Sequence, residues 1–378
     1  MKRILFIMHS MPIGGAEKVL IDILDNIDYT AYDIDLLLYT NEGELLPKVN
    51  KNVRIYAAFE PRKRTLWRRI IGRIEKMLNL IDYIEKKHTR KAIHSNYDCI
   101  ISFCQGPAHK LHTFLLDRAS KHISWVHSDL TVHNWGKLFF HNSVIKQERA
   151  YNLMTDIVFV SEGAKTSFLK LFNIKKCINK TVVYNIIDAN NIRKNALDVK
   201  IARIDSKFIF VNLGRLVKAK AQIRLVEAAK KLIRIRTDFE IWIIGEGPLK
   251  EKLQESIINN GLSNIVKLFG EKINPYPYIN VADVFVLSSC QEGFSLVICE
   301  ALVLGKPVIS TKVVGPCELL YNSKYGMLVD ENVDSIVNAM LELMNNPILV
   351  EHYSKAAIER SKMFDVSTAM SEIYKVIG

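Results

Sequence analysis

The sequence predicts an α/β protein of two Rossmann-like domains, each with a parallel sheet, facing each other across a central cleft. Three observations carry this prediction: the length, the alternation of short apolar runs with helical patterns, and one polar seam near the middle. The chain has 378 residues and is 49% hydrophobic. Because a single hydrophobic core stops growing at roughly 250 to 300 residues, two cores are expected.

Short apolar runs bounded by polar residues mark the expected strands in both halves. In the first half they cover residues 3–8, 32–39, 52–59, 97–103, 122–127, 156–161 and 181–185, and in the second half 207–214, 239–245, 265–270, 282–289, 306–311 and 326–330. Helical stretches such as QIRLVEAAKKLIRIR separate them. Strands that alternate with helices in this way favour parallel sheets covered on both faces.

The seam lies in residues 185–207, which are rich in charged and amide side chains and contain no aromatic residue. It divides the chain into an N-terminal domain, 1–188, which is expected to bind the acceptor, and a C-terminal domain, 189–378, which is expected to bind the donor. The last helices, within 348–377, are expected to pack on either domain.

The composition narrows the class of partner. The net charge is +12 with a sequence pI near 9.2, which favours anionic partners. Nucleic acid is disfavoured because basic and aromatic residues do not interleave as they do in single-strand binders. No run approaches the roughly 20 apolar residues of a membrane span, so we expect a cytoplasmic protein or a peripheral one on the cytoplasmic face of the inner membrane.

The six cysteines never form C-x-x-C, which indicates reduced, buried thiols.

The densest basic segment runs from Arg62 to Lys76, and its apolar residues recur at helical spacing. This pattern predicts a basic amphipathic helix. Two interpretations remain open: a helix packed on its own domain with a solvated basic face, or a contact with an anionic membrane surface.

The segment SSCQEGFSLVICEALVLGKPVIS, residues 288–310, is the most informative for function. A buried strand ends, a turn follows, and a helix is predicted to begin near Phe294. The backbone N–H groups of Phe294, Ser295 and Leu296 would then form an anion site at a helix start, next to Gly293. Glu292 and Glu300 would bracket the anion, one on a sugar and one on a ribose.

Other candidate residues follow predicted strands. Arg215 and Lys220 follow the strand ending at Gly214 and would neutralise a departing diphosphate, whereas isolated loop cations are usually only solvated. Gly14 and Gly15 begin a helix and let a ligand approach the backbone. His127, which precedes Asp129 in WVHSD, could hydrogen-bond a substrate hydroxyl, although a lone histidine is more often structural.

Two motif-like patterns are interpreted as structural. Asp33 and Asp35 form a D-x-D, but they lie at the start of a predicted strand, away from its carboxyl end. Gly245 and Gly247 lack the third glycine of a dinucleotide loop. Because the sequence shows no clustered metal ligands, we expect a metal-free mechanism without a cofactor.

Taken together, these motifs resemble the retaining glycosyltransferases of family 4, which have the GT-B fold and act in bacterial cell-surface polysaccharide synthesis. The resemblance covers GGAEKV, WVHSD, FVSEGAK, YNIID, GRLVKAK, IIGEGPL and ADVFVLSSCQEGFSLVICEAL, with the E-x₇-E spacing of Glu292 and Glu300 as its most specific element. Ala221 stands where relatives usually have glycine, and YNIID lacks a proline often found there.

The resemblance implies roles for these residues. Arg215 and Lys220 would bind the donor diphosphate, Glu292 the donor sugar and Glu300 the ribose. His127 would lie beside the transferring sugar, and the N–H of Gly15 near the phosphates. The leaving phosphate would deprotonate the acceptor hydroxyl on the same face.

The expected function is transfer of a hexose or N-acetylhexosamine from a UDP-linked sugar to a glycan acceptor, which the basic segment suggests is lipid-linked. Alternatives are a sugar-nucleotide epimerase or a phosphorylase on the same fold, and a non-catalytic nucleotide-sugar-binding protein. Family resemblance does not fix the donor or the acceptor.

Overall fold

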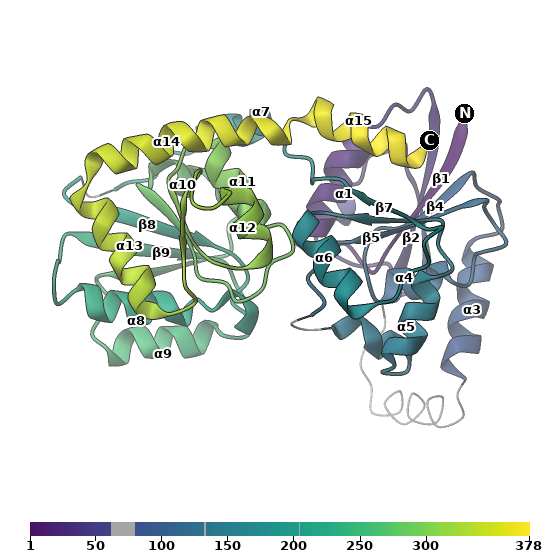
Figure 1. The fold of residues 1–378 in the computed structure, drawn as a ribbon, viewed down its shortest axis with the longest axis horizontal. Coiled ribbons are helices and arrows are strands. Elements are labelled where there is room, and N and C mark those ends of the chain that lie inside the picture. Colours follow the sequence, from purple (N-terminus) through teal and green to yellow (C-terminus); the bar gives the residue numbers. More distant parts are fainter. Residues whose placement is uncertain (62–79, 132–133, 204) are drawn as a thin grey trace. The chain divides into compact units, whose positions relative to one another are not determined.

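The computed structural model describes residues 1–61, 80–131, 134–203 and 205–378. These residues divide into two compact units (Figure 1). Unit 1 consists of Met1–Ile186 and Ala369–Gly378, and unit 2 of Ile187–Thr368. The division falls close to residue 188. The predicted basic helix at 62–76 lies outside the described residues.

Unit 1 is built on a seven-stranded parallel sheet with the order β3-β2-β1-β4-β5-β6-β7. Its strands are β1 (Lys2–Met8), β2 (Tyr32–Thr40), β3 (Arg54–Phe59), β4 (Cys99–Ser102), β5 (Lys121–Val126), β6 (Asp156–Phe159) and β7 (Asn179–Val182). All of the predicted first-half runs contribute a strand. The last was placed too late, because β7 ends at Val182, where its pairing with Phe159 of β6 ends.

The helices of unit 1 lie between its parallel strands in the sequence, except α15, which ends the chain. They are α1 (Gly15–Asn26), α3 (Ile81–Ala92), α4 (Pro107–His112), α5 (Val144–Tyr151), α6 (Glu162–Leu171) and most of α15 (Val366–Ile377), with 3₁₀ helices η1 (Leu46–Lys48) and η2 (Trp135–Phe140). In α1 the buried residues Val19, Leu20, Ile23 and Leu24 recur at helical spacing and form the face that packs on the sheet.

Unit 2 has a six-stranded parallel sheet with the order β10-β9-β8-β11-β12-β13. Its strands are β8 (Phe208–Leu213), β9 (Phe239–Ile244), β10 (Val266–Gly270), β11 (Val284–Leu287), β12 (Val308–Thr311) and β13 (Met327–Val329). Its helices are α7 (Ala189–Asn195), α8 (Ile223–Leu232), α9 (Lys250–Asn259), α10 (Tyr276–Val281), α11 (Leu296–Val303), α12 (Val314–Leu320), α13 (Val333–Asn345) and α14 (Pro347–Ser361), with 3₁₀ helices η3 (Lys218–Lys220) and η4 (Lys362–Phe364). The polar seam therefore includes a helix, α7.

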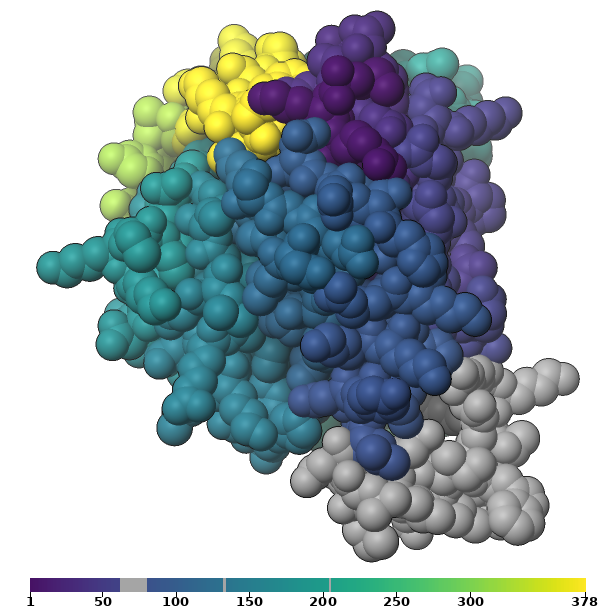
Figure 2. All heavy atoms as spheres, turned by 90° about the vertical axis from the view of Figure 1, so that its right-hand side faces the viewer, coloured from purple at the N-terminus to yellow at the C-terminus, as the bar shows by residue number. Residues whose placement is uncertain are grey.

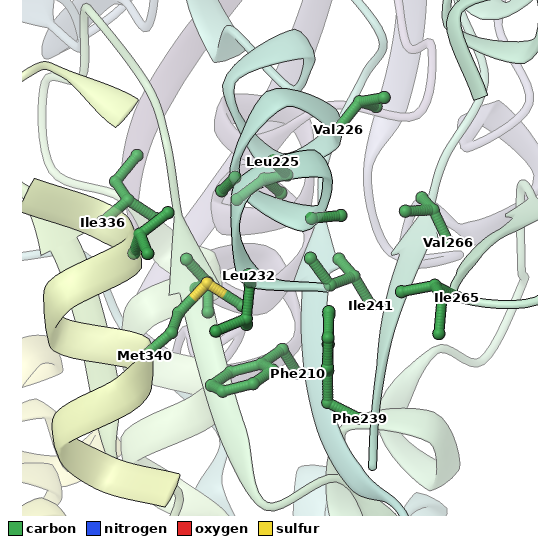
Figure 3. Close-up of a cluster of buried hydrophobic side chains, with 14 of the residues drawn as sticks. Phe210, Leu225, Val226, Leu232, Phe239, Ile241, Ile265, Val266, Ile336 and Met340 are labelled. Atoms are coloured by element: carbon green, nitrogen blue, oxygen red, sulfur yellow. The ribbon is translucent and has the colours of Figure 1, made fainter. Parts of the chain in front are cut away.

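The core of unit 2 lies between its sheet and helices α8, α9 and α13 (Figure 3). Leu225 and Leu232 of α8 and Met340 of α13 point toward Phe210 and Ile241 of the central strands. Each of these side chains is at most 1% exposed. This packing explains why the strands appear in the sequence as continuous apolar runs, since both faces of the sheet are covered.

Both sheets reverse their strand order at one position. In unit 1 this occurs between β1 and β4, and in unit 2 between β8 and β11. Ligands of open parallel sheets bind beyond the carboxyl ends of the strands at such reversal points. A ligand-binding site is therefore expected at the loops after these four strands.

The C-terminal segment completes unit 1. The Lys2 Nζ donates to the backbone oxygen of Gly378 at 2.5 Å, and the Tyr374 hydroxyl accepts from the Asp28 N–H at 2.9 Å. The rings of Tyr32 and Tyr374 stack with centroids 5.6 Å apart. Figure 2, which looks onto unit 1, shows the yellow C-terminal residues against the purple N-terminal ones. The last helix thus returns to the N-terminal domain, one of the two expected placements.

Asp33 and Asp35 have structural partners. Arg54 donates to both carboxylates at 2.7 Å, and the Tyr97 hydroxyl donates to Asp35 at 2.7 Å. The two carboxylates raise the pKa of Arg54. They join β2 to β3 near the amino ends of the strands, away from the edge where ligands bind.

Among the described residues, no helix is long and apolar enough to cross a membrane.

Three buried histidines of unit 1 are connected by side-chain contacts. His109 and His112 both contact the Ser102 hydroxyl, at 3.3 and 3.0 Å, and His112 Nε2 lies 3.1 Å from His122 Nδ1. Burial lowers the pKa of His109 to about 3, that of His112 well below its usual value, and that of His122. All three rings are therefore neutral near pH 7.

We expect these rings to make unit 1 sensitive to acid. Their folded pKa values lie below the unfolded value of about 6.5, so the unfolded chain binds more protons as the pH falls through about 6.5. The free energy of unfolding should then fall by roughly 1.4 kcal/mol per buried histidine for each pH unit below about 6.5, toward the folded pKa values. Urea unfolding at about pH 7.5 and about pH 5.5 measures this slope. His109→Phe should reduce it, with the exposed His94→Gln as the matched control; an equal slope in the two variants would contradict the assignment.

Candidate active site

The predicted cations and carboxylates of unit 2 lie in two loops at its strand reversal. Arg215 and Lys220 follow β8, and Glu292 follows β11. Because β8 and β11 are neighbours in the sheet, their carboxyl ends bring these loops together.

Lys220 and Glu292 form an ion pair between the loops. The Lys220 Nζ donates to Glu292 Oε1 at 2.6 Å, and the Ser289 hydroxyl donates to the same oxygen at 2.8 Å. The Glu292 side chain is 8% exposed and that of Lys220 26%. A nearly buried carboxylate needs such partners, and two donors on one oxygen fix its orientation. The Arg215 side chain is exposed.

Backbone contacts hold the two loops in register. The Cys290 N–H donates to the Ala219 carbonyl at 2.8 Å, and the Ser288 hydroxyl donates to the Lys220 carbonyl at 3.0 Å. Arg224, from the first turn of α8, donates to the Ser288 carbonyl at 2.9 Å. The roles of Ser288, Ser289 and Arg224 could not be predicted from the sequence, because only the tertiary pairing of β8 with β11 gives them a role.

The helix after Glu292 begins later than expected. It starts at Leu296 rather than near Phe294, because Ser295 adopts the left-handed conformation with φ 73°. Its first two N–H groups belong to Leu296 and Val297, and the first intrahelical bond runs from Ile298 to Ser295. The helix-start donors are therefore shifted by about half a turn from the prediction. The Ser295 hydroxyl is buried without a hydrogen-bond partner among the described residues.

Glu300 lies one turn inside α11 and is 5% exposed. The Tyr276 hydroxyl, from the start of α10, donates to its Oε1 at 3.2 Å. This buried carboxylate in an apolar helix therefore has a partner, from the first residue of α10.

Gly315, at the start of α12, determines how closely that helix approaches the Glu292 loop. A Cβ at Gly315 would lie 2.8 Å from the backbone of Phe294, and its N–H donates to the Glu292 carbonyl at 3.4 Å. Its only sequence signal is a glycine that follows the next strand.

Close backbone packing at the carboxyl edge of the unit 2 sheet explains why residues 245 and 247 are glycines. A Cβ at Gly245 would lie 2.1 Å from the Gly214 carbonyl, and one at Gly247 would lie 2.6 Å from the Leu216 carbonyl. These glycines let the loop after β9 pack on the backbone that carries Arg215, as expected for a pair that is not a dinucleotide motif.

In unit 1, Gly14 and Gly15 begin α1 as predicted. Gly14 is the N-cap, and a Cβ there would lie 2.2 Å from Glu17 Oε2. The Glu17 carboxylate therefore lies over this helix start, where it stabilises the helix dipole. Glu17 was missed, although a glutamate three residues after an N-cap is a capping signal.

His127 follows β5 directly, as expected. Its ring lies against Phe103, with centroids 4.7 Å apart, and stacks on Trp125 at 6.3 Å. Burial lowers its pKa to about 3, with a hydrogen bond to the Phe103 backbone opposing the shift. The residue is only partly buried, yet Nε2 itself is buried and lacks a hydrogen-bond partner among the described residues. The neighbouring Asp129 accepts from the Thr131 N–H and hydroxyl within its own turn.

The described residues contain no cluster of three or more histidine, cysteine or acidic side chains that could hold a metal ion. The six cysteines are free. The expectation of buried thiols is confirmed for Cys99 and Cys299, whereas Cys104, Cys290 and Cys317 are only partly buried. It was wrong for Cys177, which is exposed because it lies in the loop before β7.

Ala221 connects Lys220 to α8 in the left-handed conformation, with φ 47° and ψ 37°. This explains why glycine suits the position, since a Cβ is disfavoured there by roughly 1 to 2 kcal/mol. Glycine costs roughly 0.5 to 1 kcal/mol in unfolded-state entropy.

Ala221→Gly should therefore stabilise unit 2 by up to about 1 kcal/mol in chemical denaturation, since relief of the left-handed strain outweighs the entropic cost of glycine. Ala356→Gly within α14 is the control and should destabilise by about 1 kcal/mol; destabilisation by both would show that Ala221 is not strained.

Comparison with known proteins shows which proteins this chain is similar to. Residues 194–360 match the family model "Glycosyl transferases group 1". The fold is GT-B: the structure of Anabaena HepE in complex with UDP aligns with a TM-score of 0.75, covering 99% of both chains at 20% identity. Two Rossmann-like domains and the group 1 match together support a glycosyltransferase.

Three curated relatives are named as glycosyltransferases. The N-acetylgalactosamine-N,N'-diacetylbacillosaminyl-diphospho-undecaprenol 4-alpha-N-acetylgalactosaminyltransferase of Campylobacter jejuni is 35% identical over 223 residues, 58% of this chain and 59% of that protein. The UDP-Gal:alpha-D-GlcNAc-diphosphoundecaprenol alpha-1,3-galactosyltransferase of Escherichia coli is 26% identical over 90% of this chain and 87% of its own length. A relative from Staphylococcus aureus, 27% identical over 52% of this chain and 54% of its own length, is named as the capsular polysaccharide biosynthesis glycosyltransferase CapM.

Proposed function

We propose that this protein is a retaining, metal-independent glycosyltransferase of family 4 that transfers a hexose or N-acetylhexosamine from a UDP-linked sugar to a glycan hydroxyl. The observation that carries the proposal is the Lys220–Glu292 pair at the strand reversal of unit 2. It places a cation and an oriented carboxylate where parallel sheets bind nucleotides. The UDP complex of HepE supports the choice of nucleotide.

In this proposal the diphosphate lies between the two loops. Arg215 and Lys220 supply positive charge, and the N–H groups of Leu296 and Val297 with the Ser295 hydroxyl supply hydrogen-bond donors. Gly293 and Phe294 shape the approach to these donors, and the proposal also assigns Gly14 and Gly15 to donor binding. Glu300 holds the ribose.

Glu292 then acts by orientation rather than by covalent attack. Its Oε1 already accepts from Lys220 and Ser289, which makes the carboxylate a weak nucleophile but a good acceptor for sugar hydroxyls. The departing phosphate takes the acceptor proton on the same face, with His127 beside the sugar. As the bond to phosphate breaks, the cations stabilise the charge that develops.

A donor screen tests the proposal. We expect one UDP-sugar, without metal, to stabilise the protein by about 2.7 kcal/mol at a hundredfold excess over Kd. Thermal unfolding with UDP-, GDP-, ADP- and CMP-sugars measures this. Glu300→Ala should abolish the shift because it removes the ribose acceptor, whereas Glu255→Ala on the exposed face of α9 should keep it.

The same experiment separates the alternatives. No stabilisation by any nucleotide sugar, with an intact fold, would exclude the proposed donor site. Conversion of the sugar while it stays nucleotide-linked would identify an epimerase. Sugar phosphate formed from a glycan and inorganic phosphate would identify a phosphorylase, and donor binding with no turnover on any acceptor a binding protein.

We further propose that the acceptor is lipid-linked and is met at an anionic membrane surface on the cytoplasmic side. The relatives from Campylobacter jejuni and Escherichia coli carry diphospho-undecaprenol acceptors in their names. In this chain, the basic segment from Arg62 to Lys76 supplies the charge. Leu80 and Tyr83, which lie shortly after it in the sequence, are 41% and 64% exposed.

Neutralising the basic segment should weaken membrane binding. Changing Arg68, Arg69 and Arg73 to Gln should cost about 1 kcal/mol each, measured by sedimentation with phosphatidylglycerol vesicles, with donor stabilisation unchanged. The control changes the exposed Lys170, Lys175 and Lys176 to Gln and removes the same net charge. Equal sedimentation of the first variant and the unchanged protein would rule out this surface.

A further inference from the structure

Gln105 lies in the loop after β4, next to the strand reversal of unit 1, and is 1% exposed. With its amide oxygen turned toward the loop after β5, the side chain accepts from the Ser128 N–H at 3.0 Å and from the His127 N–H at 3.2 Å. One buried oxygen thus holds two successive N–H groups of the neighbouring loop. Neither contact is predicted by a motif.

The same segment also holds the ring of His127. The Phe103 ring packs against the imidazole at 4.7 Å, and the Phe103 backbone hydrogen-bonds to it. Since Nε2 lacks a hydrogen-bond partner among the described residues, the bond to Phe103 belongs to Nδ1. A ring nitrogen bonded to a carbonyl carries the proton, which leaves Nε2 as an acceptor.

We infer that Gln105 is a positioning residue that fixes the backbone of His127, so that its neutral Nε2 accepts a hydrogen bond from a sugar hydroxyl at the carboxyl edge of unit 1. The inference rests on the proposed function, because it assigns the ligand of Nε2 as a sugar hydroxyl. The two hydrogen bonds that the Gln105 oxygen accepts both come from the loop that carries His127. Its effect on the reaction therefore passes through the imidazole.

Substitution at residue 105 separates positioning from packing. Gln105→Leu removes both contacts to the backbone N–H groups at nearly the same size, whereas Gln105→Glu keeps an acceptor oxygen at the same side-chain length. Gln105→Asn keeps the amide but shortens the side chain, and it replaces the leucine variant if that variant does not fold. Thermal unfolding verifies that each variant is folded.

The first readout is the His127 ring in ligand-free protein. Long-range ¹H–¹⁵N spectra, assigned by the signals lost in His127→Gln, should show one neutral tautomer protonated at Nδ1 in the unchanged protein and in Gln105→Glu. In Gln105→Leu we expect mixed tautomers. An unchanged ring pattern in Gln105→Leu overturns the inference.

The second readout is release of UDP from UDP-glucose, UDP-galactose, UDP-N-acetylglucosamine or UDP-N-acetylgalactosamine, whichever stabilises the protein most. Gln105→Leu should lower kcat by about 10- to 100-fold, the cost of a small misplacement, with donor affinity retained. In a His127→Ala background it should cost nothing further. An equal loss in both backgrounds overturns the inference.

The two proposals fail separately. If no UDP-sugar binds, the proposed function fails, while the ring spectra of the ligand-free protein still decide whether Gln105 holds His127. If a UDP-sugar binds but His127→Ala releases UDP at the unchanged rate, the inference fails and the donor site stands.

Discussion

The ion pair between Lys220 and Glu292 depends on one topological fact, the adjacency of β8 and β11. The two residues are 72 positions apart in the chain, and β9, β10 and their helices lie between them in sequence. The reversal of strand order brings them within hydrogen-bond distance. The contacts of Ser288, Ser289, Cys290 and Arg224 then serve to keep that pair in place, and the site of unit 2 is built around it.

Most of the fold could be predicted because its strands are covered on both faces. Such strands appear in the sequence as uninterrupted apolar runs, and helices with buried residues such as Leu225, Val226 and Leu232 show the helical period. The position of the loop residues at strand ends followed from the parallel order alone. Arg215, Lys220, Glu292 and His127 all lie at the carboxyl edge, as expected.

What the sequence did not predict are features that depend on a single backbone angle or on a distant neighbour. The start of α11 at Leu296 depends on the left-handed Ser295, and propensity does not favour that conformation in serine. The Glu17 carboxylate over Gly14 depends on a side-chain rotamer. Gln105 and Gly315 act across loops that meet only after the sheets have formed, so local patterns give them no distinctive signal.

The return of α15 to unit 1 has a consequence for synthesis on the ribosome. Domains generally fold as units as they emerge, the N-terminal one first. Here Tyr32 and Asp28 can contact Tyr374, and Lys2 can contact Gly378, only after the end of the chain has been synthesised. The domain that is translated first is therefore the last to be completed. Until then its first strand and the neighbouring helix leave a surface uncovered, and a nascent chain stalled within unit 2 would expose that surface to chaperones and proteases.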